Sequence, residues 1–243
     1  MSEAMDALVL VGGMGTRLLP VVYDRPKPMA EVAGLPFVEW LLLYLRRQGL
    51  RRVILATGHQ GEMVETYFGN GARLGLEVSY SHESSPLGTG GAMALALPKV
   101  QTTSVLVLNG DSFCAFDAEH MLSVKRRTGA RALLWLVWAL DCQRYGTVET
   151  GKDNAVLAFR EKAPGFRAGA INAGVYLLQR DLLTAVPQAL PRSLEIDVFP
   201  SLIGHGLYAV TGTGPFLDIG TPESYRMAES FVAENVALWH GGL

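Results

Sequence analysis

A short segment near the start of the chain combines residue types that bind phosphate: VGGMGTRLLPVVYDRPKPM at 11–29. Its three glycines are Gly12, Gly13 and Gly15. Glycines that follow a strand let the backbone approach a ligand closely, and their N–H groups can cradle phosphate oxygens. The Arg17 guanidinium can bind such oxygens in pairs, and the prolines beside Lys27 reduce the entropy lost when a ligand immobilises it. These residues predict a site for a phosphate-bearing substrate.

The residue pattern of this loop differs from those of two common phosphate-binding loops. GxxxxGK[ST] is absent, so the loop is not a P-loop, and GxGxxG of the dinucleotide-binding fingerprint is absent as well. Pro20, Pro26 and Pro28 predict that the chain stays extended after the glycines and does not enter a helix at once.

Two aspartates farther along the chain follow short apolar runs. Asp111 comes after SVLVLN at 104–109, and Asp218 lies in FLDIG. An aspartate in such a position often caps a turn. Two carboxylates beside a phosphate substrate also suit Mg²⁺, which keeps several waters and takes phosphate oxygens as ligands.

The elements that must position these residues are indicated by hydrophobic periodicity. Strands are expected at 7–11, 52–56, 76–80, 104–109 and 132–138, and helices at 36–49, 61–69 and 89–98. This alternation favours a mostly parallel, doubly wound sheet with helices on both faces, and such sheets bind ligands outside the carboxyl ends of their strands. After about residue 145 we expect short strands, some antiparallel, and then one long helix at 222–239.

Composition limits the classes of partner. The 243 residues are 49% hydrophobic and 18% charged, with a formal net charge of −2, so a nucleic acid or an anionic membrane surface is not an expected partner. Cys114 and Cys142 form neither a metal cluster nor a disulfide framework. The apolar stretch at 132–140 is too short to span a bilayer, and we expect a cytoplasmic protein.

Seven segments in order resemble the sugar-1-phosphate nucleotidylyltransferases, over nearly the whole chain. They are GGMGTRLLP…RPKPM, PLGTGGA (86–92), LNGDSF (108–113), RYGTV (144–148), REK (160–162), INAGVYLL (171–178) and FLDIGTPESY (216–225). The resemblance implies a Rossmann-like three-layer αβα sandwich with a mixed, mostly parallel central sheet, as in GT-A-like folds. It also implies an enzyme that joins a nucleoside triphosphate to a sugar 1-phosphate and releases pyrophosphate.

The resemblance assigns roles to positions of this chain. Phosphate chemistry is assigned to Arg17, Lys27 and Lys162, and one Mg²⁺ to Asp111 and Asp218. Nucleotide binding is assigned to Gly12, Gly13, Gly15, Glu83, Gly88 and Thr89, and sugar binding to Tyr145, Gly146, Glu161, Asn172 and Gly174. We expect one domain over 1–243, with a nucleotide-binding half at about 1–145 and a sugar-phosphate half at about 146–243.

Glu83 bears on the choice of base. Family members that use uridine or thymidine triphosphates commonly have a glutamine about five residues before the first glycine of the segment that matches PLGTGGA. In this chain that glycine is Gly88, and Glu83 stands at the position of the glutamine. An ionised carboxylate only accepts hydrogen bonds, so it fits the adjacent N1–H and N2–H₂ donors of guanine. GTP is therefore the expected nucleotide, and UTP is the alternative.

Within the family, the short chain and its motifs favour a manno-heptose 1-phosphate as the sugar substrate for bacterial surface glycans. N-acetylmuramate 1-phosphate with UTP, in cell-wall recycling, and mannose 1-phosphate with GTP are the alternatives. A non-catalytic, nucleotide-sugar-binding regulatory subunit is a further alternative. A metal-dependent glycosyltransferase is disfavoured because LNGDSF offers one aspartate instead of a D-x-D motif. A homodimer is also compatible with the sequence.

Overall fold

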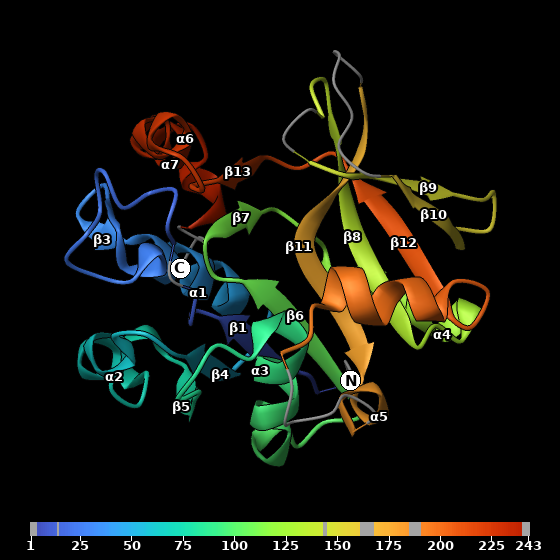
Figure 1. The fold of residues 1–243 in the computed structure, drawn as a ribbon, viewed down its shortest axis with the longest axis horizontal. Helices are drawn as coiled ribbons and strands as arrows, with labels where there is room; N and C mark the ends of the chain where they lie inside the picture. The colour runs from blue at the N-terminus through green and yellow to red at the C-terminus, as the bar shows by residue number, and fades with distance from the viewer. Residues whose placement is uncertain (1–3, 14, 143–144, 161–167, 185–190, 240–243) are drawn as a thin grey trace.

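The computed structural model describes residues 4–13, 15–142, 145–160, 168–184 and 191–239. Its main element is a nine-stranded sheet (Figure 1). The strands are β1 (Asp6–Leu10), β4 (Arg52–Thr57), β5 (Glu77–His82), β6 (Ser104–Asn109), β8 (Ala132–Ala139), β9 (Thr147–Thr150), β10 (Val156–Arg160), β11 (Gly169–Gln179) and β12 (Leu207–Gly212). The strands expected from the sequence are thus confirmed, with ends shifted by one or two residues.

The sheet is mixed. Its order is β10-β9-β11-β6-β1-β4-β5, with β8 paired to β11 and β12 paired to β8. Strands β6, β1, β4 and β5 run parallel to one another, whereas β11 is antiparallel to both β6 and β8. The first half of the chain therefore supplies the parallel region. The second half adds the antiparallel strands β9, β10 and β11, and also β12, which pairs parallel with β8.

Helices cover both faces of the sheet. They are α1 (Phe37–Arg47), α2 (Gly61–Phe68), α3 (Gly88–Ala96), α4 (Ala118–Thr128) and α5 (Arg180–Thr184). Side chains alternate along β1: Val9 packs in the cluster that contains α1 and α4, and Leu8 packs in the cluster that contains α3. Because successive residues of a strand point to opposite faces, this alternation produces the predicted three layers.

Two predictions for local structure were wrong. The expected helix at 222–239 is divided into α6 (Pro222–Arg226), α7 (Ala228–Glu234) and a 3₁₀ turn at Val236–Leu238. The chain tightens at Met227, whose N–H donates to the carbonyl of Ser224 three residues earlier. After the glycine loop the chain is also not extended. It makes turns from Gly15 onward and a 3₁₀ turn at Lys27–Met29, where Pro28 is tolerated because the first turn needs no N–H donor there.

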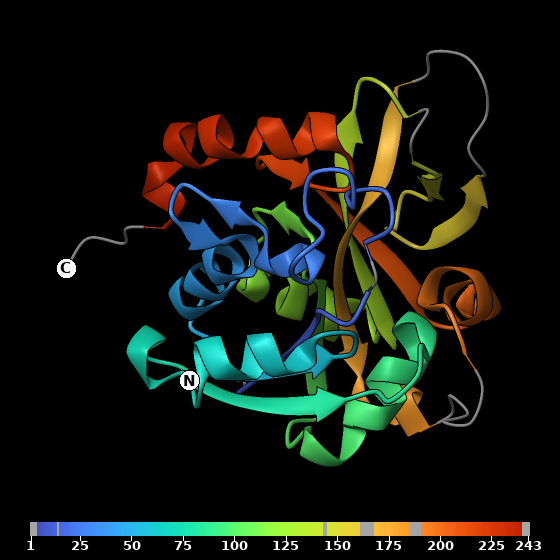
Figure 2. The ribbon, with the colours of Figure 1, turned by 60° about the vertical axis from the view of Figure 1, so that its left-hand side comes forward.

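Two small sheets lie beside the main one. β2 (Glu31–Val32) pairs with β3 (Leu35–Pro36), and β7 (Ser112–Cys114) pairs with β13 (Phe216–Asp218). Figures 1 and 2 show α6 and α7 alongside the segment that contains β2 and β3, where the Tyr225 hydroxyl donates to the Glu31 carbonyl at 2.6 Å. The pairing of β7 with β13 matters most for the site, because it joins two segments about a hundred residues apart.

Candidate active site

The two predicted metal aspartates lie next to each other at the carboxyl edge of the parallel strands. Asp111 follows β6, and Asp218 pairs with Ser112 in the β7–β13 ladder. The N–H of Ile219 donates to the main-chain carbonyl of Asp111 at 3.1 Å, which holds the two segments in register. The sequence placed each aspartate at the end of an apolar run, and the fold brings the two together.

Lys27 is bound to one member of this pair, Asp111. Its Nζ donates to Asp111 Oδ2 at 2.7 Å. The lysine side chain is 6% exposed, whereas that of Asp111 is 37% exposed, so the carboxylate faces outward from a buried cation. The charge of Lys27 is therefore available at the site without being freely solvated.

Two glycines make room for this arrangement. A Cβ on Gly15 would lie 2.7 Å from the Cβ of Lys27, and a Cβ on Gly220 would lie 2.4 Å from Asp218 Oδ1. Gly220 also donates its N–H to Asp218 Oδ1 at 2.7 Å. A side chain at either position would displace a charged group of the site.

A cavity of about 570 Å³ opens beside these carboxylates, lined by residues from both halves of the chain. Five of its lining residues were predicted from the sequence: Arg17, Tyr145, Gly146, Asn172 and Asp218. Its polar wall also includes Asn109, Ser193 and Glu195, and its apolar wall includes Val148, Phe159 and Ile196. A mixed lining of this kind suits a sugar, which has hydroxyl groups and apolar C–H faces.

Sequence reasoning assigned none of these additional residues to the site, for different reasons. Asn109 lies within the LNGDSF segment and could have been included on that ground. Ser193 and Glu195 belong to a short π-helical turn, Leu194–Val198 with Ser193 as its N-cap, in a part of the chain that has no recognisable motif. Only the folded chain brings this turn to the cavity.

The predicted base-reading residue, Glu83, lies against the glycine loop. Its Oε1 is 2.8 Å from the position a Cβ on Gly12 would take and 2.9 Å from the corresponding position on Gly58. Its Oε2 accepts from the N–H of Leu87 at 3.0 Å. Burial raises the pKa of the Glu83 carboxyl, and the Leu87 N–H offsets part of this effect. Glu83 lines a separate hollow of about 380 Å³, together with His59 and His82.

The predicted nucleotide loop at Gly88 and Thr89 contacts the second half of the chain. Gly88 has φ +70°, and a Cβ there would lie 2.5 Å from the Arg192 carbonyl oxygen. The hydroxyl of Thr89 accepts from the N–H of Leu194 at 2.8 Å and donates to Glu195 Oε2 at 3.2 Å. The turn that carries Glu195 is therefore fastened to the start of α3.

Three of the predicted sugar residues, Tyr145, Gly146 and Asn172, line this cavity, and Asn172 is held by hydrogen bonds. Its Oδ1 accepts from the Gly174 N–H at 3.0 Å, and its Nδ2 donates to the Tyr176 hydroxyl at 2.9 Å. Gly174 has φ +73°, and a Cβ there would lie 2.7 Å from Asn109 Nδ2. The Tyr145 ring packs edge-on against Phe216, with 6.0 Å between the ring centroids. The last two predicted site residues, Glu161 and Lys162, lie outside the described ranges.

The donor set at the aspartate pair fits Mg²⁺. In the part of the chain that the structure describes, no group of three or more His, Cys, Asp or Glu side chains could hold a metal ion. A site with two carboxylates, at Asp111 and Asp218, leaves positions for phosphate oxygens and water, as Mg²⁺ requires.

Among the helices of the described ranges, none combines the length and apolar character needed to cross a membrane.

Fold and site together describe an α/β protein that groups a lysine and two aspartates at the carboxyl edge of its sheet. The sequence matches the Nucleotidyl transferase family over residues 6–235, and the chain belongs to this family.

Similar proteins agree with this assignment. The chain is 39% identical over 227 residues to a D-glycero-alpha-D-manno-heptose 1-phosphate guanylyltransferase of Aneurinibacillus thermoaerophilus, covering 93% of this chain and 97% of that protein. It is 37% identical over 239 residues to a mannose-1-phosphate guanylyltransferase of Mycobacterium tuberculosis, covering 97% of this chain and 67% of that protein. A crystal structure of HddC from Yersinia pseudotuberculosis complexed with GMP-PN matches with a TM-score of 0.81 and 31% identity, covering 93% of this chain and 99% of the other.

Proposed function

We propose that the protein transfers GMP from GTP to a sugar 1-phosphate, giving a GDP-sugar and pyrophosphate. The observation that carries the proposal is the grouping of Asp111, Asp218 and Lys27 beside a cavity that is lined by Arg17 and Asn172. This grouping combines cations for phosphate, carboxylates for a divalent ion, and polar groups for a sugar.

The reaction joins two anionic substrates, so its main requirement is charge stabilisation and positioning. A phosphate oxygen of the sugar 1-phosphate attacks the α-phosphorus of GTP, and the bond to pyrophosphate breaks in line. Arg17 and Lys27 are assigned to neutralise the triphosphate and the departing pyrophosphate, and Lys162 is assigned to the sugar phosphate. The attacking oxygen is already anionic, so no residue is needed to remove a proton from it.

Asp111 and Asp218 are the residues that would hold Mg²⁺. The ion would supply positive charge at the phosphate oxygens as it binds them. Lys27 stabilises the outward-facing Asp111 carboxylate through its bond of 2.7 Å, and the N–H of Gly220 orients Asp218. These contacts fix both carboxylates before substrates arrive.

Base selection is assigned to Glu83, with Gly12, Gly13, Gly15, Gly88 and Thr89 completing the nucleotide site. The ionised carboxylate accepts from N1–H and N2–H₂ of guanine but has no proton to donate to the carbonyls of uracil. A GMP-PN complex is known for the HddC structural neighbour, and both curated relatives described above are named as guanylyltransferases.

D-glycero-α-D-manno-heptose 1-phosphate is the proposed sugar, recognised by Tyr145, Gly146, Glu161, Asn172 and Gly174. The heptose relative supports this choice because the alignment covers nearly its whole length. Mannose 1-phosphate is the second candidate, since the mannose enzyme is almost equally similar. The product would then serve bacterial surface glycan synthesis in the cytoplasm. A homodimer remains a prediction that light scattering would test.

The test is pyrophosphate release with Mg²⁺, using GTP, UTP, dTTP, ATP and CTP in turn against heptose, mannose, glucose and N-acetylmuramate 1-phosphates. We expect turnover with GTP and the manno-heptose, with mannose as the next best acceptor. Turnover with UTP and N-acetylmuramate 1-phosphate would overturn the base assignment. Tight nucleotide-sugar binding without turnover on any acceptor would favour a regulatory subunit.

A further inference from the structure

The hydroxyl of Tyr176 lies in the core between a carboxylate and an amide. Tyr176 is fully buried. Its hydroxyl donates to Glu195 Oε1 at 2.9 Å and accepts from Asn172 Nδ2 at 2.9 Å. Glu195 and Asn172 both line the cavity, so Tyr176 connects two walls of the site from behind.

The direction of these hydrogen bonds is fixed by the chemistry of the three groups. An ionised carboxylate can only accept, so Glu195 takes the single hydroxyl proton of Tyr176. The tyrosine oxygen must then accept, which turns the nitrogen of the Asn172 amide toward it and the Asn172 oxygen toward the Gly174 N–H. The flipped amide would set its N–H against the Gly174 N–H and face Tyr176 with an oxygen for which no proton remains.

The hydrogen-bond network continues from Glu195 to Thr89, a predicted nucleotide-binding residue. Glu195 Oε2 accepts from the Ser193 hydroxyl at 2.9 Å and from the Thr89 hydroxyl at 3.2 Å. Thr89 belongs to the first turn of α3, in the predicted nucleotide loop. The Glu195 carboxylate is thus hydrogen-bonded through both oxygens. Through the Tyr176 hydroxyl it fixes the orientation of the Asn172 amide.

We propose that Glu195 and Tyr176 are positioning residues that set the orientation of the Asn172 amide toward the sugar. The inference rests on the proposed function in assigning Asn172 to a sugar hydroxyl pair. With its amide fixed, Asn172 has one N–H and one oxygen lone pair left, so a donor and an acceptor face the substrate in a defined order. An amide free to flip would present the two in either order.

The first test is Tyr176→Phe, which removes the hydroxyl and keeps the ring. We expect KM for the sugar 1-phosphate to rise about tenfold, as for the loss of one well-oriented hydrogen bond, while KM for GTP changes less than about twofold. Combining Tyr176→Phe with Asn172→Ala should add nothing to the effect of Asn172→Ala alone, because the hydroxyl acts through the amide. An unchanged sugar KM, additive effects, or an equal rise of both KM values would overturn the proposal.

Tyr44→Phe is the matched control. Its hydroxyl is buried as well and donates to the Phe116 carbonyl at 2.6 Å, away from the cavity. This variant should lower stability without changing either KM. If it raises the sugar KM as much as Tyr176→Phe does, the effect belongs to the loss of any buried hydroxyl and the proposal fails.

Variants of Glu195 separate orientation from direct contact. Glu195→Gln can keep an oxygen toward Tyr176 by turning its NH₂ to the hydroxyls of Thr89 and Ser193, which can rotate to accept. Glu195→Ala removes the acceptor. We expect the alanine variant to reproduce the sugar KM of Tyr176→Phe and the glutamine variant to stay within about threefold of the parent protein. Equal losses in both variants would mean that the charge itself contacts the sugar, against a positioning role.

A readout without catalysis separates failure of this inference from failure of the proposed function. The side-chain ¹⁵N–H₂ resonances of Asn172, identified by their loss in Asn172→Ala, should shift in Tyr176→Phe and stay unchanged in Tyr44→Phe. If the parent protein transfers no nucleotide to any sugar 1-phosphate, the proposed function fails while this spectrum still decides the inference. Unshifted Asn172 resonances in Tyr176→Phe would overturn the inference even in an active enzyme.

Discussion

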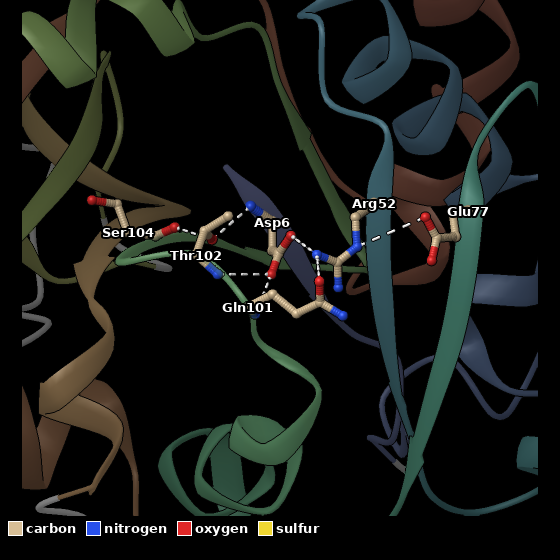
Figure 3. Close-up of polar contacts among 6 residues, drawn as sticks. All are labelled: Asp6, Arg52, Glu77, Gln101, Thr102 and Ser104. Carbon is tan, nitrogen blue, oxygen red and sulfur yellow. Dashed lines mark hydrogen bonds and ion pairs between the residues drawn. The ribbon is translucent and has the colours of Figure 1, made fainter. Parts of the chain in front are cut away.

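The same pair of strands carries an aspartate at each end, and the two aspartates have opposite surroundings. Asp6 begins β1 opposite Val105 of β6, and Asp111 follows the other end of β6. Asp6 is 1% exposed, and its Oδ2 accepts from the N–H groups of Gln101 at 2.6 Å and Thr102 at 3.3 Å. Figure 3 shows Arg52 completing this cluster, with its Nη1 3.3 Å from Asp6 Oδ1.

The same residue type thus serves structure at one edge of the sheet and is placed for chemistry at the other. The Asp6 carboxylate is surrounded by donors that the fold supplies, which ties the loop at 101–103 to the first strand. The Asp111 carboxylate has a buried lysine on one oxygen and is 37% exposed, so it keeps capacity for a ligand. Carboxylates that are fully paired within the protein stabilise it, whereas an outward-facing carboxylate suits a metal.

Asp111→Asn should give the largest effect on activity. It keeps the size of the side chain and removes the charge, so we expect turnover to fall about a thousandfold, the loss of several kcal/mol of charge stabilisation. The variant should stay folded, because the amide oxygen can still accept from Lys27, but it should melt at a lower temperature, because the buried ammonium loses its charged partner. Pyrophosphate release and thermal unfolding measure the two outcomes, and near-normal turnover would remove Asp111 from the metal site.

Asp6→Ala should lower stability and leave turnover unchanged. Two N–H groups and Arg52 lose their acceptor, so the free energy of unfolding should fall by about 3 kcal/mol. The turnover of the protein that remains folded should equal that of the parent. Urea unfolding and kinetics below the unfolding transition check this prediction. A large loss of turnover per folded molecule would show that the two edges are not independent.

Gly220→Ala should show how strictly the position of Asp218 is set at the carboxyl edge. The added Cβ would lie 2.4 Å from Asp218 Oδ1 and 3.3 Å from Lys27 Nζ, so the carboxylate must move. Displacing a reacting group by about 1 Å can cost about a hundredfold in rate. We expect a decrease of that size in kcat with a small change in stability. Wild-type kcat would mean that the position of Asp218 is not critical.

Glu83→Gln should give the smallest of these effects. We expect the preference for GTP over UTP, as a ratio of kcat/KM values, to fall about tenfold at pH 7.5. Because burial raises the pKa of Glu83, its carboxyl takes up a proton at a higher pH than an exposed glutamate does. The advantage of the parent over the variant should therefore shrink as the pH is lowered. The charge of nearby His82 acts in the opposite direction, favouring ionised Glu83. A preference that is unchanged by the substitution would mean that Glu83 does not read the base.

The sequence predicted the parts of this molecule that local patterns encode. Strand β6 was predicted to the residue, because SVLVLN is a continuous apolar run bounded by polar residues. Asp111 and Lys27 were predicted from motifs, but their contact across 84 positions of sequence required the fold. Glu195 and Tyr176 were missed because their role depends on hydrogen bonds between α3, β11 and a short turn, which no periodicity reports. The break at Met227 was missed because the helical pattern continues through it.

The most direct test of the division between the two edges is anomalous diffraction from crystals grown with Mn²⁺ and a non-hydrolysable GTP analogue. Mn²⁺ prefers the same oxygen ligands as Mg²⁺ and can be located by its scattering. We expect one peak within bonding distance of a carboxylate oxygen of Asp111 and of Asp218, and none at Asp6. A peak elsewhere, with Asp111 bound to Lys27 alone beside the nucleotide, would contradict this expectation.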